Sequence, residues 1–194
     1  NAEDWQAYLT DTLKGPSHKV DLLRDNEATR EKMRKYANRA TARVEPGGTL
    51  WFVFIGHGAP SNDGKDGLLV GADAQQDVDS FFERSLSRNE LLTLLAKGRQ
   101  TKTVVLLDAC FSGKSPSGEA LIAGLQPLVA TRALQLGIDN RTILLTAAKS
   151  DQFAGPLPKA GKMRHAFSYL ALGALRGWAA DAEGKVTASA LIDF

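Results

Sequence analysis

The chain has 194 residues, of which 43% are hydrophobic and 24% are charged, a composition typical of a globular protein with its own core. Its 24 basic and 22 acidic side chains leave a formal charge of +2, which is too small to predict a nucleic-acid partner. The single cysteine excludes an internal disulfide, and no apolar stretch approaches the ~20 residues that a membrane-spanning helix needs.

The first quarter of the chain predicts two helices with a short strand between them. Apolar side chains recur at helical spacing through residues 2–14, which predicts a helix. The short apolar run KVDLLRD, residues 19–25, predicts a strand. Residues 25–44 are charged and predict a helix of about 18 residues, capped by Asp25 or Asn26.

Three continuous apolar runs predict strands buried on both faces of a sheet: TLWFVFI at 49–55, TVVLLDA at 103–109 and RTILLTAA at 141–148. Helices are predicted at 87–98 and 165–178, where apolar residues follow capping signals or dominate the segment. This alternation indicates an α/β fold with a mostly parallel central sheet and helices on both faces.

One long segment has no clear period. Residues 56–79 are rich in Gly, Asp and Ser, and a loop of this length in a compact domain is usually functional or partly disordered. We find no linker, so residues 1–194 are interpreted as a single domain.

The ends of the sequence are unusual, because Asn1 already lies in a predicted helix and TASALIDF reads as a helix that is just beginning. We interpret the chain as part of a longer protein, whose further domains are candidate partners. The cytoplasm is the default compartment, and a secretion signal ahead of Asn1 stays open.

Two reactive side chains follow two of the predicted strands. His57 comes after the strand at 49–55, and Cys110 comes after the strand at 103–109. Ligands of such sheets lie beyond the carboxyl ends of the strands, so we expect both side chains on the same rim. A thiolate attacks carbonyl carbon, and an imidazole supplies the acid or base that this chemistry needs. The glycines beside His57 leave the backbone N–H groups of Gly58 and Cys110 open to a developing oxyanion.

The segments FIGHG (54–58) and LLDACFSG (106–113) resemble the His-Gly and Asp-x-Cys-x-x-Gly motifs of caspase-like cysteine peptidases, particularly metacaspases and their prokaryotic relatives. The resemblance implies a three-layer sandwich with a central six-stranded sheet, whose first strand would precede Asn1. It also implies that Cys110 is the nucleophile and His57 the general acid/base of an endopeptidase that needs no cofactor.

The same resemblance implies which side chain the substrate carries. Asp108, two residues before Cys110, matches an acid that binds Arg or Lys of a peptide or protein substrate in metacaspases. Asp151 matches a second acid near that pocket, and Asp4 is a third candidate. Ile55 replaces the serine of the family pattern. The family's calcium-binding aspartates are absent at SRNE, residues 87–90, so no metal is expected.

Plainer interpretations stand beside each of these. A lone cysteine is often a buried small hydrophobe, and Asp108 would also serve as a structural acid that caps backbone N–H groups. The alternative for the whole chain is a catalytically silent caspase-like module that recruits partners within a larger protein.

Overall fold

The centre of the molecule is a parallel sheet. The structure is a computed structural model that describes residues 1–113, 121, 139–147 and 165–193. Within these residues, β1 (Thr49–Ile55), β5 (Lys102–Asp108) and β6 (Thr142–Thr146) form a three-stranded sheet in the order β1-β5-β6. Both pairs of neighbours run parallel, so the three predicted strands and the parallel sheet are confirmed.

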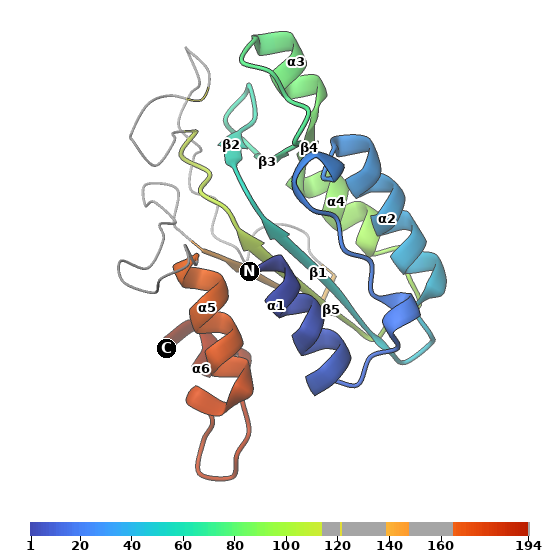
Figure 1. Ribbon diagram of the computed structural model, residues 1–194, viewed down its shortest axis with the longest axis vertical. Coiled ribbons are helices and arrows are strands. Elements are labelled where there is room, and N and C mark those ends of the chain that lie inside the picture. Colours follow the sequence, from blue (N-terminus) through green and yellow to red (C-terminus); the bar gives the residue numbers. More distant parts are fainter. Residues whose placement is uncertain (114–120, 122–138, 148–164, 194) are drawn as a thin grey trace.

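Side chains alternate between the two faces of this sheet. Leu50, Phe54, Val105 and Leu107 pack into one buried cluster, together with Met33 of α2 (Arg30–Arg43) and leucines of α4 (Arg88–Leu95). The intervening side chains pack with α1 (Ala2–Ala7), η1 (Tyr8–Thr12) and α5 (Ala166–Gly173). Figure 1 shows α1 and α5 on one side of the sheet and α2 and α4 on the other. The predicted helical layer on each face is therefore confirmed.

The segment predicted to be irregular contains a second sheet. Strands β2 (Gly58–Pro60), β3 (Gly67–Val70) and β4 (Ser85–Ser87) pair antiparallel in the order β2-β3-β4. A short helix, α3 (Val78–Glu83), separates β3 from β4. The expectation of a structureless loop is wrong, because strands of three or four residues rich in glycine carry too few apolar positions to show a period.

Two further expectations are corrected. Residues 20–24 are not a strand: this extended segment links two 3₁₀ turns, η2 (Ser17–Lys19) and η3 (Asp25–Glu27), and Leu23 packs against the cluster around Met33. The long helix begins at Arg30, and Thr29 caps it by accepting a hydrogen bond from the Lys32 N–H at 3.2 Å.

The C-terminal helix continues from α5 into a π-helical turn, η5 (Ala174–Trp178), which ends where Gly177 adopts a φ of 113°. After a turn, α6 (Ala188–Asp193) follows. None of the helices in the described part of the chain is long and apolar enough to cross a bilayer.

Candidate functional site

The two predicted reactive residues follow paired strand ends. In the register of β1 and β5, Ile55 lies opposite Asp108, and the Gly56 N–H donates to the Asp108 carbonyl at 3.1 Å. His57 and Cys110 each come two residues after this last pair. The structure therefore brings both residues to the same end of two adjacent strands. His57 is exposed and Cys110 is partly buried.

Side chains near the ends of β1 and β5 alternate between the two faces of the sheet. Val53 and Ile55 pack on the α1–α5 face. Ala109 and Phe111 instead belong to the cluster on the α2–α4 face, and Cys110 lies between them in sequence. Both candidate residues lie beyond the last paired residues of these strands, and the chain bends at Gly56 before it reaches His57.

Backbone contacts at Gly58 bring the two loops together. A Cβ atom at position 58 would lie 2.8 Å from the Cys110 carbonyl oxygen and 2.9 Å from the Phe111 ring. Only glycine leaves room for this approach, because real Cβ atoms do not pack that closely. Position 58 therefore requires glycine on steric grounds, which the sequence pattern did not reveal.

The N–H of Gly58 also has a defined direction. Gly58 lies opposite Leu69 in the β2–β3 pair, and the Val70 N–H donates to the His57 carbonyl at 3.0 Å. This pattern makes Gly58 and Leu69 a non-hydrogen-bonded pair. The Gly58 N–H therefore points away from β3, as a donor to a substrate oxyanion would require.

Ser112 is a neighbour of the thiol that the sequence analysis did not single out. Its Oγ lies 3.0 Å from Cys110 Sγ in a hydrogen bond. The spacing Cys-x-Ser was visible in the sequence, but no local rule assigns it this contact.

Asp108 lies beneath α5 and is only 1% exposed. Its Oδ2 accepts hydrogen bonds from the backbone N–H of Ser168 at 3.1 Å and from the Ser168 hydroxyl at 2.5 Å. Its Oδ1 lies 3.4 Å from Nδ1 of His165, the residue that precedes α5. This pairing raises the pKa of His165 above its ordinary 6.5, although partial burial opposes the rise. The carboxylate therefore fastens the first turn of α5 to the carboxyl end of β5.

The other predicted acids are placed differently. Asp4 lines a cavity of about 250 Å³ between α1 and the α5–η5 helix, together with Tyr169, Arg176 and Trp178. His57 and Cys110 do not line this cavity. Asp151 lies outside the described residues. Across the described part of the chain, histidine, cysteine and acidic side chains form no group of three that could hold a metal ion.

Comparison with known proteins identifies no family for this chain. No protein-family model matches the chain, and no curated protein matches it. Among solved structures, protein GSU0716 from Geobacter sulfurreducens is similar with a TM-score of 0.40 and 21% identity, over 57% of this chain and 41% of that one. The match thus spans less than half of that protein's length, and a likeness this distant identifies neither a family nor an activity.

Proposed function

We propose that the chain is a caspase-like cysteine endopeptidase in which Cys110 is the nucleophile and His57 the general acid/base. The observation that carries the proposal is the shared strand-end position of the two residues, held by the Gly56–Asp108 backbone hydrogen bond and by the close approach of Gly58 to Cys110. The parallel sheet between two helical layers supports a caspase-like sandwich as the fold that presents them.

The proposed reaction uses groups of this chain alone. The Cys110 thiolate attacks the substrate carbonyl carbon, and the backbone N–H groups of Gly58 and Cys110 hold the resulting oxyanion. Each such donor contributes about 3 kcal/mol to acyl transfer. The imidazolium of His57 protonates the departing amine as the C–N bond breaks. His57 then takes a proton from water, which hydrolyses the thioester and releases Cys110.

The proposed substrate carries Arg or Lys before the cleaved bond, because Asp108 matches the acid that binds these residues in metacaspases. For Asp108 to bind a basic side chain, one of its oxygens must become available. Oδ1 is the available one, since its contact with His165 is longer than the two bonds that Oδ2 accepts from Ser168. Displacement of His165 by the substrate is therefore part of the proposal.

Fluorogenic peptides that differ only in the residue before the reporter group test this function. We expect turnover of the Arg and Lys peptides, lost by at least about 10³-fold in Cys110→Ala and in His57→Ala. Glu183→Ala, at an exposed position of the C-terminal turn, is the control for general effects of substitution. Absence of turnover, or turnover that survives Cys110→Ala, would overturn the proposal. Of these two outcomes, absence of turnover would also favour the alternative, a catalytically silent module.

A further inference from the structure

A buried ion pair joins the antiparallel sheet to α4. Asp66, which precedes β3, and Arg88, the first residue of α4, are 9% and 6% exposed, and Arg88 Nε lies 3.3 Å from Asp66 Oδ1. Burial lowers the pKa of Arg88, and the charge of Asp66 opposes this effect. Asp66 is the one carboxylate paired with Arg88 among the residues that the structure describes.

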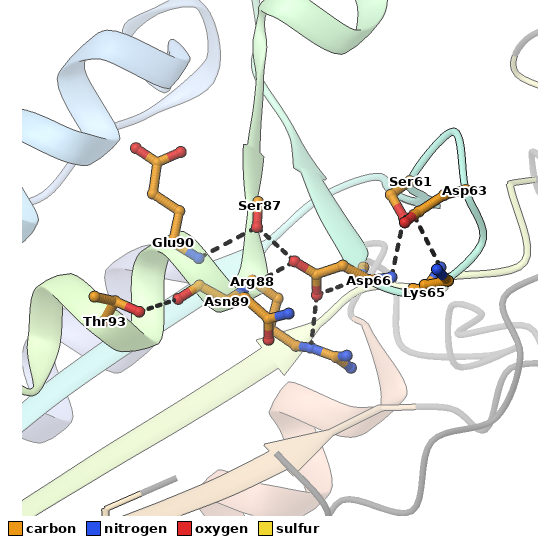
Figure 2. A network of polar contacts seen from close by, with 10 residues as sticks. Ser61, Asp63, Lys65, Asp66, Ser87, Arg88, Asn89, Glu90 and Thr93 are labelled. Atoms are coloured by element: carbon orange, nitrogen blue, oxygen red, sulfur yellow. Dashed lines mark hydrogen bonds and ion pairs between the residues drawn. The ribbon is translucent and has the colours of Figure 1, made fainter. Parts of the chain in front are cut away.

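The carboxylate of Asp66 also accepts several hydrogen bonds (Figure 2). Oδ1 accepts from the Gly67 N–H at 2.7 Å, and Oδ2 accepts from the Ser87 hydroxyl at 2.5 Å and from the Asn89 N–H at 3.1 Å. One side chain thus fixes the beginning of β3 to the beginning of α4. Residues 66 and 87–89 are far apart in sequence, so no local pattern predicts the network.

Its other end holds the loop between β2 and β3. The Asp66 N–H donates to the Ser61 hydroxyl at 2.9 Å, and the Asp66 carbonyl accepts from the Ser61 N–H at 2.7 Å. These bonds close the hairpin whose first strand begins at Gly58. The position of the hairpin relative to α4 is therefore set at Asp66.

The hairpin in turn holds the loop that carries the thiol. The Phe111 ring, 3% exposed, packs over both strands: a Cβ atom would lie 2.9 Å from it at Gly58 and 2.8 Å at Gly67. The Gly67 N–H donates to the Asp66 carboxylate, and Phe111 directly follows Cys110. A continuous series of contacts therefore leads from the ion pair through Gly67 and Phe111 to the candidate nucleophile.

We propose that the Asp66–Arg88 pair is a positioning element for Cys110, which sets the Cys110 loop against Gly58 through the packing of Phe111. Buried ion pairs seldom add stability beyond what an apolar pair would give, but in some proteins they specify one arrangement of the fold. A role of this pair in catalysis rests on the proposed function, whereas its effect on the position of Cys110 is measurable without peptidase activity.

Alkylation of Cys110 by iodoacetamide provides that measurement, because the chain has a single cysteine and the rate reports thiolate content and access. Rates are measured from pH 6 to 9 (roughly spanning ordinary thiol titration) for the wild type, Asp66→Asn and Arg88→Met. We expect both variants to change the rate at least about fivefold and to shift its pH profile. Arg88→Lys, which retains the cation, is expected to stay within about twofold of the wild type.

Asp63→Asn is the matched control, since Asp63 lies in the same loop but is exposed, and in the described part of the chain its side chain accepts from Ser61 and Lys65. It is expected to leave the alkylation profile unchanged. Gly67→Ala perturbs the same series of contacts at the Phe111 ring, and it keeps the test decisive if Asp66→Asn does not fold. In the peptidase assay, Arg88→Met is expected to lower kcat at least about tenfold with KM within about threefold.

The outcomes separate the two proposals. Unchanged alkylation in folded Arg88→Met and Gly67→Ala would overturn the positioning role, even in an active peptidase. A wild type without turnover would overturn the proposed function, while altered alkylation in the same variants would still support the positioning role.

Discussion

Replacement of Asp108 by alanine distinguishes its structural role from a role in substrate binding. The substitution removes a buried acceptor and leaves the N–H and the hydroxyl of Ser168 without their partner. It also removes the carboxylate beside His165. The structure therefore predicts a loss of folding stability that an acid in an open pocket would not cause.

The magnitude follows from these contacts. A hydrogen bond to a charged group contributes about 1.5–3 kcal/mol, and two are lost, so we expect Asp108→Ala to lower the free energy of unfolding by about 3–6 kcal/mol. This is a large part of the roughly 5–15 kcal/mol that stabilises a domain. Asp108→Asn retains an oxygen that accepts from Ser168, so its loss is expected to be about 1–2 kcal/mol.

Urea unfolding followed by circular dichroism measures this loss. With an m-value of about 2 kcal/mol/M, Asp108→Ala is expected to lower the midpoint by about 2 M. Glu183→Ala, at an exposed position of the C-terminal turn, is the control and should change stability by less than about 0.5 kcal/mol. A loss below about 1 kcal/mol in Asp108→Ala, with Arg and Lys preference abolished, would refute the structural reasoning and favour an open specificity pocket.

Three further predictions concern single positions. Because Asp108 raises the pKa of His165, this pair stabilises the fold below the ordinary pKa of 6.5, and its contribution is lost as pH rises through the raised value. Between pH 5.5 and 8.5 (roughly one unit below the unfolded pKa to two above it), the urea midpoint of His165→Gln should therefore decline less than that of the wild type. An identical decline in the two proteins would contradict this assignment. Gly58→Ala places a Cβ 2.8 Å from the carbonyl oxygen of the candidate nucleophile, so thermal unfolding should show a loss of about 1–3 kcal/mol, whereas an unchanged Tm would show that the two loops are not in contact. Ser87 caps α4 and also donates to a buried carboxylate, so Ser87→Ala should cost more than the ~1 kcal/mol expected for Thr29→Ala, which removes only a cap; equal midpoint shifts for the two variants in urea would count against the second bond.

The sequence alone was sufficient for the elements that are defined by their own periodicity. The strands at 49–55 and 103–109 were visible because a strand buried on both faces must be apolar at every position. The helix over 165–178 was visible because its apolar residues dominate the whole segment. The positions of His57 and Cys110 at one rim followed from these strands, because parallel neighbours end at the same edge of a sheet.

The tertiary structure decided what depends on partners far away in sequence. Residues 19–25 are as apolar as a strand requires, but a strand also needs a neighbour to receive its backbone hydrogen bonds. The environment of Asp108 depends on the helix that packs against its end of the sheet, and that helix begins about 60 residues later. The contact between Asp66 and Arg88 joins two positions 22 residues apart, and no local pattern in the sequence links them. Local sequence specifies which backbone conformation a segment prefers, whereas the partner of a buried charge is fixed only when the layers pack.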